Sequence, residues 1–203
     1  MKKTPQDFKR EEIKKVFKET LKSKSTILRP VSIRVTDAHD DPATFTDFSF
    51  QEIGKLSKEV LVENSPGKGF IDGLFAGLHD HFVSEYPSLR QIKLVDLMVN
   101  PSWMSSKTNM RTDAKASVIF RVEVGHHGTA SFRNQSRSMI WSSFAAALEA
   151  FQFYINCERS FDEIQPIIDD AKNRNRFDIV EKWKFKLSKL TEVNTYERKE
   201  RKN

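Results

Sequence analysis

Two stretches of the chain repeat one pattern of apolar and polar positions. In the first, a β-type run at 60–62 leads through the glycine turn 67–69 into a stretch with helical periodicity. In the second, the short run 130–132 leads through a polar turn into a similar stretch. The apolar helical positions are Ile71, Leu74, Phe75 and Leu78 in the first copy and Ile140, Phe144, Leu148, Phe151 and Ile155 in the second. The pattern predicts a pseudo-repeat of two strand-turn-helix units.

Further β-type runs precede both helical stretches. Several of them alternate apolar and polar residues, which is typical of strands with one buried face. The predicted strands are 31–36, 44–50 and 59–63 in the first unit and 92–99, 114–124 and 129–133 in the second. We therefore expect an α+β fold of two pseudo-symmetric βββα units, with antiparallel strands forming a layer and the helices on one side of it.

Amphipathic helices flank the two units. Pro5 follows a hydroxyl cap, and a narrow apolar stripe continues from there among many lysines. That stripe consists of Ile13, Val16, Phe17 and Leu21. Beyond Asn156, two more amphipathic segments, 161–168 and 179–190, suggest docking helices or a dimer arm. The expected organisation is a basic helical extension at 1–26, a domain at 27–157 divided into units 27–88 and 89–157, and a helical extension with a charged tail at 158–203.

The composition is that of a folded chain. The 203 residues are 38% hydrophobic and include sixteen phenylalanines, which is too apolar for disorder, although 31% are charged. No apolar run approaches the roughly 20 residues that a membrane span needs, and no apolar signal core follows Met1, so we expect a cytoplasmic protein. Cys157 is the single cysteine, which excludes intrachain disulfides and cysteine-based zinc clusters.

The net charge of +6 is concentrated at the two ends. Residues 1–30 carry ten Lys or Arg against four Asp or Glu, and residues 170–203 carry eleven against six, which leaves −5 for the middle. Basic ends with Trp183 and Phe185 among Lys182, Lys184 and Lys186 favour a nucleic-acid-binding protein as an alternative function. The competing interpretation of these helices is a solvated face, so nucleic acid is the less favoured partner.

The sequence predicts no catalytic residue, metal or cofactor. His79 and His81 lie two apart on a predicted helix and point in different directions, while His126 and His127 fall in a predicted hairpin turn. No P-loop, nucleophile elbow or zinc-ligand spacing is present. A carboxylate pair of Asp96 and Asp113 has no support beyond proximity in the predicted sheet. The turn at 67–69 could offer amides to an anion, or its glycines could serve the backbone alone.

Four short motifs occur in an order that resembles a known regulatory domain. Residues 67–73 read GKGFIDG, where the family has G-x-G-x-[IV]-D-A, and residues 94–97 read LVDL, where it has L-x-D-Y. An Asp-Ala pair at 113–114 and a loosely matching alanine-rich ending at 147–156 follow. Over about 125 residues the chain resembles the C-terminal, leucine-sensing and dimerising domain of the α-isopropylmalate synthase and citramalate synthase family.

The resemblance implies a non-catalytic regulatory or assembly module of branched-chain amino acid biosynthesis, leucine biosynthesis included. The implied partners are a second copy of the chain, a branched-chain amino acid and a separate catalytic synthase subunit. The catalytic barrel is absent, and its metal-binding H-x-H strand is not supplied by 79–81, which lies on a predicted helix, so we expect no enzyme activity.

The family's effector lies in an apolar pocket between the two units. The implied effector-binding residues are Gly67, Gly69, Leu94, Leu97, Pro101, Asp113, Ala114, Asn134 and Ser136. The alternative for Leu94 and Leu97 is ordinary sheet core. Two departures, 134–136 in place of a second glycine turn and Leu97 in place of a tyrosine, could change the choice of effector or abolish binding.

Overall fold

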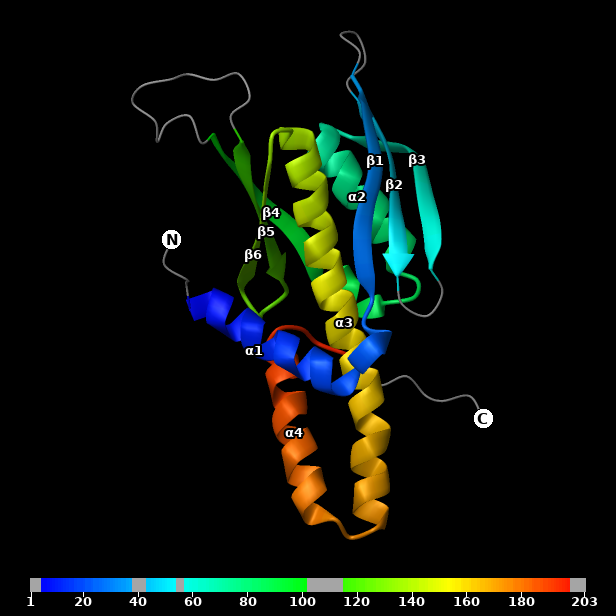
Figure 1. The fold of residues 1–203 in the computed structure, drawn as a ribbon, viewed down its shortest axis with the longest axis vertical. Helices are drawn as coiled ribbons and strands as arrows, with labels where there is room; N and C mark the ends of the chain where they lie inside the picture. Colours follow the sequence, from blue (N-terminus) through cyan, green and yellow to red (C-terminus); the bar gives the residue numbers. More distant parts are fainter. Residues whose placement is uncertain (1–4, 38–42, 54–56, 102–114, 198–203) are drawn as a thin grey trace.

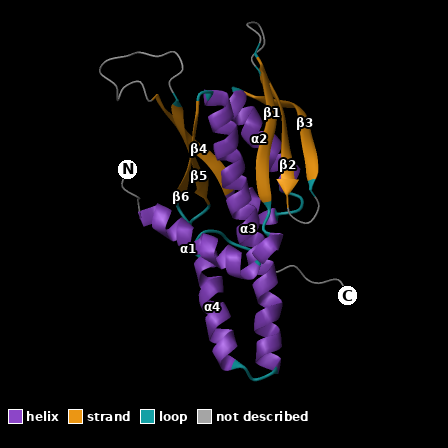
Figure 2. Cartoon of the chain, viewed as in Figure 1, coloured by secondary structure: helices purple, strands orange, loops and turns teal. Residues whose placement is uncertain are grey.

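The computed structural model describes residues 5–37, 43–53, 57–101 and 115–197, with side chains from residue 9 onward (Figures 1 and 2). The first unit comprises β1 (Ile27–Thr36), β2 (Thr44–Ile53), β3 (Lys58–Gly67) and α2 (Phe70–Phe82), and the second comprises β4 (Ile92–Pro101), β5 (Ala116–Val124), β6 (Thr129–Ser136) and α3 (Met139–Asn173). The flanking helices are α1 (Pro5–Thr20) and α4 (Phe177–Thr191), and the short 3-10 turns are η1 (Lys22–Lys24) and η2 (Pro87–Gln91). The predicted α+β class and the doubled βββα order are confirmed.

The six strands form two antiparallel sheets with helices packed between them. The strand order is β1-β2-β3 in one sheet and β4-β5-β6 in the other, and α2 and α3 begin at the same end of the molecule (Figure 1). Helix α2 packs on β2 and β3 of its own unit. Helix α3 packs on β5 and β6 and also on β1, so it contacts both sheets.

The first and middle strands of the two units correspond closely, whereas only the β2-β3 pairing has a register shift, between Thr46 and Phe48. The first residue of each middle strand, Thr44 or Ala116, pairs with the last residue of the third strand, Gly67 or Ser136. The first strand of each unit carries a bulge at the equivalent place. Val31 is the extra residue in β1 and Val95 in β4, and both valine side chains are exposed.

Aromatic contacts between the units are reciprocal. Phe48 and Phe120 occupy equivalent positions on the middle strands, and Phe75 and Phe144 occupy equivalent positions on the helices. Phe48 of the first unit packs on Phe144 of the second at 5.4 Å between ring centroids, and Phe120 of the second packs on Phe75 of the first at 6.2 Å. Each unit thus offers the same pair of positions to the other, which is the signature of a two-fold relation.

A third contact lies on the axis of this relation. Phe82 and Phe151 are equivalent residues of α2 and α3, and their rings pack on each other at 6.2 Å. A residue that touches its own counterpart must lie close to the two-fold axis. The predicted pseudo-repeat is therefore a pseudo-two-fold dimer within one chain.

Helix α3 extends far beyond its counterpart. It has 35 residues against 13 in α2, so the helix expected to end near Cys157 continues to Asn173 with Pro166 inside it. Its second half forms an antiparallel hairpin with α4, and α1 crosses beside both (Figure 1). The predicted apolar stripe of α1 is buried, which makes α1 a helix docked on the domain by one face.

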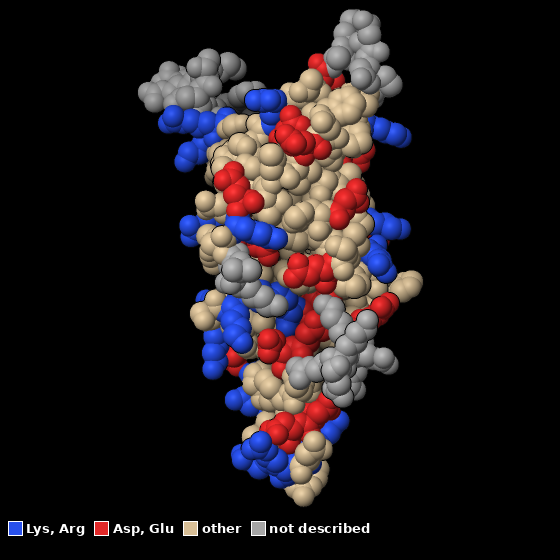
Figure 3. All heavy atoms as spheres, turned by 90° about the vertical axis from the view of Figure 1, so that its right-hand side faces the viewer, with Lys and Arg blue, Asp and Glu red and all other residues tan. Residues whose placement is uncertain are grey.

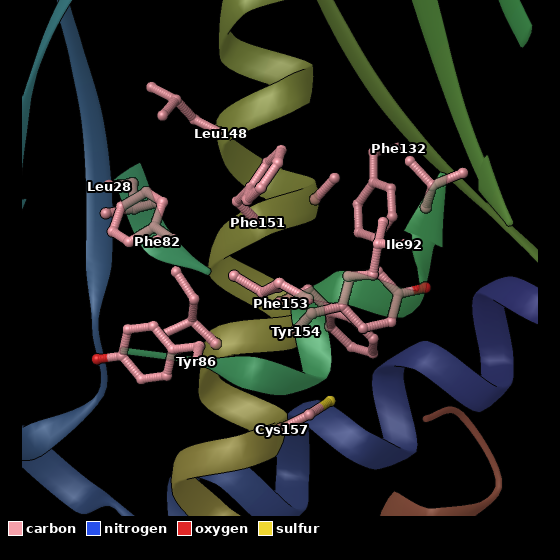
Figure 4. Packing of buried hydrophobic residues seen from close by; sticks show 14 of the residues in the cluster. Leu28, Phe82, Tyr86, Ile92, Phe132, Leu148, Phe151, Phe153, Tyr154 and Cys157 are labelled. Atoms are coloured by element: carbon pink, nitrogen blue, oxygen red, sulfur yellow. The ribbon is translucent and has the colours of Figure 1, made fainter. Parts of the chain in front are cut away.

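Side chains of α3 reach into both halves of the core. Figure 4 shows Phe151 beside Phe82 on one side of α3, and Phe153 and Tyr154 beside Phe132 of β6 on the other. All five of these side chains are buried. Together with Phe144, which packs on Phe48 of β2, these side chains give one helix apolar contacts with two sheets that share no hydrogen-bonded strand pair.

Polar groups of α3 also close an exposed sheet edge. The Asn156 amide accepts a hydrogen bond from the Thr26 N–H and donates one to the Thr26 carbonyl, both at 2.8 Å. One turn earlier, Gln152 Oε1 accepts from the Leu28 N–H at 2.8 Å. Because β1 is an edge strand, these amides satisfy backbone groups that would otherwise be open to another strand.

Replacing Asn156 by alanine should destabilise the fold by about 2–4 kcal/mol, because it leaves a buried N–H and a buried carbonyl of Thr26 without partners. Urea denaturation of the variant measures this loss. Asn173→Ala, at the exposed end of the same helix, is the matched control and should change stability by less than about 0.5 kcal/mol. Equal effects of the two substitutions would contradict the role given to Asn156.

Candidate functional site

The helix N-termini of the two units lie together at one end of the molecule (Figure 1). Gly69 is the N-cap of α2 and Ser138 is the N-cap of α3. The carbonyl of each cap accepts the first helical bond, from Gly73 N–H at 3.1 Å and from Ser142 N–H at 2.9 Å. Ser138 also accepts from the Trp141 N–H through its hydroxyl, whereas Gly69 has no side chain to offer. This end of the molecule therefore presents the positive ends of two helix dipoles.

The turns that lead into these helices join strand to helix in two different ways. In the first unit, Gly67 lies so close to Gly73 that an added Cβ on Gly67 would come within 2.2 Å of the Gly73 nitrogen. In the second unit, the equivalent residues are Ser136 and Ser142, whose hydroxyls are 2.8 Å apart and hydrogen-bonded. A backbone approach in one unit is replaced by a side-chain hydrogen bond in the other. The serine pair thus stands in the second unit where the glycine pair stands in the first. The structural counterpart of the glycine turn 67–69 is 136–138, two residues later than the 134–136 expected from the resemblance.

Gly67→Ala should lower the free energy of unfolding by about 3 kcal/mol, because its Cβ can be accommodated only by moving the first turn of α2. Gly69→Ala is the control: its φ of −170° suits any residue, and no atom lies within 4 Å of the added Cβ. This control should change stability by less than about 1 kcal/mol. Chemical denaturation compares the two variants, and similar losses would contradict the close approach at Gly67.

Four of the effector-binding residues predicted by resemblance lie at this end. Gly67 ends β3, Gly69 caps α2, and Ser136 ends β6. Pro101 is at the same end, since it is paired with Ala116, which is paired in turn with Ser136. Asn134 is half-buried, two residues before the end of β6.

The other four predicted residues lie elsewhere or are not described. Leu94 and Leu97 are half-buried and pack against the core, opposite Val122 and Phe120 respectively. Both face the core because the bulge at Val95 shifts the alternation of the strand by one residue. This placement agrees with the alternative of ordinary sheet core. Residues 113–114, the predicted Asp-Ala pair, lie outside the described residues.

The space between the two units is occupied by their own phenylalanines. Phe75 of α2 packs on Phe151 of α3 at 5.4 Å, in addition to the reciprocal pairs and the pair on the axis. The expected apolar slot between the units is filled at this level. A ligand that contacts both units would bind at the end where the helices begin.

The histidines that the structure describes do not form a metal site. His81 packs on Phe50 at 5.7 Å, and its burial lowers the pKa of its imidazole, so the ring is neutral near pH 7. His126 and His127 lie in the β5-β6 turn, and His127 Nε2 is 2.9 Å from Thr195 Oγ1. Over residues 5–37, 43–53, 57–101 and 115–197, no group of three or more His, Cys, Asp or Glu side chains could hold a metal ion. Cys157 is fully buried, and burial raises the pKa of its thiol.

The proposed carboxylate pair is not assembled within the described part of the chain. Asp96 forms an ion pair with Arg121 at 3.5 Å across β4 and β5. Asp113 belongs to the segment that is not described. Asp96 thus has a structural partner on the neighbouring strand.

A cavity of about 170 Å³ that sequence analysis did not anticipate lies beneath α1. Its walls come from α1, the β5-β6 hairpin from 127 to 131, α3, and Val193 beyond α4. Its cationic side chains are Lys9 and Arg10, and the Arg10 guanidinium donates to the Ser131 carbonyl and lies 5.0 Å from the Phe132 ring. The sequence shows the basic residues of α1 and the two adjacent histidines of a turn, but no pattern in it predicts that they line one cavity.

Lysines of α4 form ion pairs with glutamates of α1. Lys189 of α4 bonds Glu12 of α1 at 3.1 Å, and Lys186 of α4 bonds Glu19 of α1 while lying 4.0 Å from the Trp183 ring. On the face shown in Figure 3, cationic and anionic side chains are interspersed. Lys186 and Lys189 therefore link α4 to α1 through ion pairs, so their charge is partly neutralised.

No known protein family matches the chain, and no curated protein resembles it closely enough in sequence to serve as a relative. Within the described ranges, no helix is both long enough and apolar enough to cross a membrane.

Proposed function

We propose that the chain is a non-catalytic sensing and assembly module of the kind found at the C-terminus of α-isopropylmalate and citramalate synthases. The observation that carries this proposal is the pseudo-two-fold packing of two βββα units, with Phe48 on Phe144 and Phe120 on Phe75. The order of the short motifs adds to it. In this proposal the effector is a branched-chain amino acid, and the chain acts on a separate catalytic subunit in the cytoplasm.

The helix N-termini provide the physical basis for binding a carboxylate. Unpaired amides in the first turn of a helix, together with the helix dipole, favour an anion at that position. Gly69 leaves room for a ligand to approach the amides of α2, since nothing lies within 4 Å of the place where its Cβ would be. Ile71, the second residue of the helix, is half-buried and offers an apolar contact for a branched side chain.

Calorimetric titration with leucine, isoleucine and valine tests the sensing function. At a ligand concentration of 100 times Kd, binding to the folded state alone should stabilise the protein by about 2.7 kcal/mol and raise its Tm. The absence of heat and of a thermal shift with all three amino acids would exclude sensing and leave assembly.

Two substitutions at Gly69 locate the effector. Gly69→Asp should stabilise α2 slightly, by about 0.5 kcal/mol, because a carboxylate suits an N-cap, yet it should weaken leucine binding tenfold or more, because it occupies the amides and repels the ligand carboxylate. Gly69→Asn is an uncharged cap of the same size and should retain more of the binding. Thermal melts and calorimetry give the two readouts. Equal leucine affinity in both variants would place the carboxylate elsewhere.

Assembly is tested separately from sensing. Exposed apolar side chains on the strands, Val31, Leu61 and Val95 among them, are available to a second copy of the chain. Sedimentation equilibrium with and without leucine measures the association. A monomer at all concentrations would exclude the homodimer without affecting the calorimetric result.

A further inference from the structure

The two sheets leave four edge strands among the described residues, namely β1, β3, β4 and β6. An edge strand offers unpaired N–H and C=O groups to another strand, and folded proteins protect such edges with charges, prolines, bulges or covering side chains. Two of the four edges are covered by side chains from a helix. Gln152 and Asn156 of α3 bond to the backbone at the beginning of β1, and Arg10 of α1 donates to the Ser131 carbonyl of β6.

The second half of β4 lacks such protection. The bulge at Val95 and the charges of Lys93 and Asp96 belong to its first half. Beyond them, residues 97–100 read Leu-Met-Val-Asn, with no charge, proline or bulge. This half of the strand therefore presents an open edge.

The apolar face of the same half is incompletely covered. Leu97 and Val99 lie opposite Phe120 and Val118, which are both 0% exposed, so all four side chains are on the inner face of the sheet. Leu97 is nevertheless only half-buried, and Val99 is 37% exposed. Among the described elements, only β5 packs extensively on β4. An open edge and a partly open apolar face thus coincide.

The pseudo-two-fold relation supplies a comparison within the chain. Counted from the equivalent bulges, Met98 of β4 corresponds to Arg34 of β1. Arg34 is exposed, so two copies of β1 that paired around this residue would bring like charges together. Met98 carries no charge. The position is therefore protected against self-pairing in β1 and unprotected in β4.

Residues 96–100 of β4 are complementary to themselves. In an antiparallel pair of two β4 strands centred on Met98, Leu97 lies opposite Val99 of the second copy, and Asp96 lies opposite Asn100 of the second copy. The first pair brings two apolar side chains together on the inner face. The second pair allows an amide to donate to a carboxylate across the strands.

The remaining edge, β3, is the contrasting case. Its apolar run 60–62 is flanked by Glu59 and Glu63, and Leu61 at the centre is 62% exposed. An antiparallel pair centred on Leu61 would place Glu59 opposite Glu63 at both ends, and like charges directly opposite each other destabilise a sheet. Of these two apolar runs, only that of β4 pairs with a second copy without such repulsion.

We propose that two copies of the chain associate through antiparallel pairing of their β4 strands, centred on Met98. The three-stranded sheets then join into one, in the order β6-β5-β4-β4-β5-β6. Leu97 and Val99 of each copy gain apolar contacts from the other. This inference rests on the assembly part of the proposed function, for which it names the surface, and it does not depend on leucine sensing.

Sedimentation equilibrium of the full chain compares Met98→Arg with Leu61→Arg. Met98→Arg places like charges on the two-fold axis and should raise the dimer dissociation constant at least about tenfold. Leu61→Arg makes a similar change on an edge strand outside the interface and should not. The fold should accept Met98→Arg, since β1 carries Arg34 at the equivalent position, and circular dichroism checks this. Equal effects of the two substitutions, or none of Met98→Arg, would overturn the interface.

A mixture of charge variants tests the position of the axis. Met98→Glu alone should weaken association for the same reason as Met98→Arg. An equimolar mixture of the two should associate more tightly than either alone, because opposite charges then meet on the axis. Damage to the fold of either variant cannot produce this gain. Its absence would overturn the pairing centred on Met98.

A cysteine substitution reports the same register without adding charge. Opposite residues of an antiparallel pair have Cα atoms about 4.5–5.5 Å apart, which is within the range that a disulfide spans. Met98→Cys should therefore form an intermolecular disulfide under mild oxidation, detected on a non-reducing gel, and Leu61→Cys should not. The native Cys157 is fully buried and does not compete. Equal cross-linking of the two variants, or none of Met98→Cys, would overturn the register.

The failure of this inference is distinguishable from the failure of the proposed function. A dimer that Met98→Arg leaves intact would overturn the β4 interface and leave the assembly function in place. A wild-type chain that is monomeric at all concentrations would overturn both, and a strand of another protein would then be the occupant of β4 to test. Leucine binding to Met98→Arg, measured by calorimetry, tests sensing independently of either result.

Discussion

Helix α3 has to bury the apolar faces of two sheets at once, and the rest of the structure depends on this constraint. A small sheet gains stability by burying an apolar face, and a helix packed on that face is one way to do so. Helix α2, with 13 residues, covers mainly its own sheet, whereas α3 packs on β5, β6 and β1. Because α3 packs on both sheets, it is buried almost continuously from Ser142 to Phe161. Most of its polar residues on this stretch are buried as well, and Asn156 and the half-buried Gln152 close the edge of β1.

The pseudo-two-fold relation explains which features recur and which do not. The bulges at Val31 and Val95 and the reciprocal phenylalanine contacts are present in both units, because each unit must present the same surface to the other. The hydrogen bonds from the side-chain amides of Gln152 and Asn156 to the edge of β1 have no counterpart in the first unit. Phe82 is equivalent to Phe151, so Val83 and Pro87 are the residues equivalent to Gln152 and Asn156. Neither of them has an amide in its side chain. The symmetry is thus kept where the units touch and lost where α3 alone continues.

The strands and the pseudo-repeat could be predicted from the sequence because they depend on local periodicity. The alternation along β5 and the three-to-four spacing along α2 and α3 are properties of one face of one element. The length of α3 could not be predicted in this way. Its polar stretch at 156–160 reads as a helix end, yet these residues face other elements: Glu158 accepts from the Ser88 N–H at 3.1 Å, and Asn156 contacts Thr26.

The candidate sites were predictable to different degrees for a similar reason. The end of the molecule with Gly67, Gly69 and Ser136 follows from turns adjacent in sequence to the helices they begin. The shared orientation of Leu94 and Leu97 toward the core could not be predicted, since the bulge at Val95 that produces it leaves no trace in the pattern of apolar residues. The cavity beneath α1 joins residues about 120 positions apart, and only the crossing of α1 over the β5-β6 hairpin brings Arg10 to Ser131.

The position of that cavity follows from the loss of symmetry. Helices α1 and α4 pack against the extension of α3, and α1 thereby covers the turn end of the β5-β6 hairpin. The cavity lies at the junction of a helix docked by one apolar stripe and a hairpin that belongs to the second pseudo-symmetric unit. Arg10 bridges this junction, because its guanidinium donates to the Ser131 carbonyl and lies over the Phe132 ring.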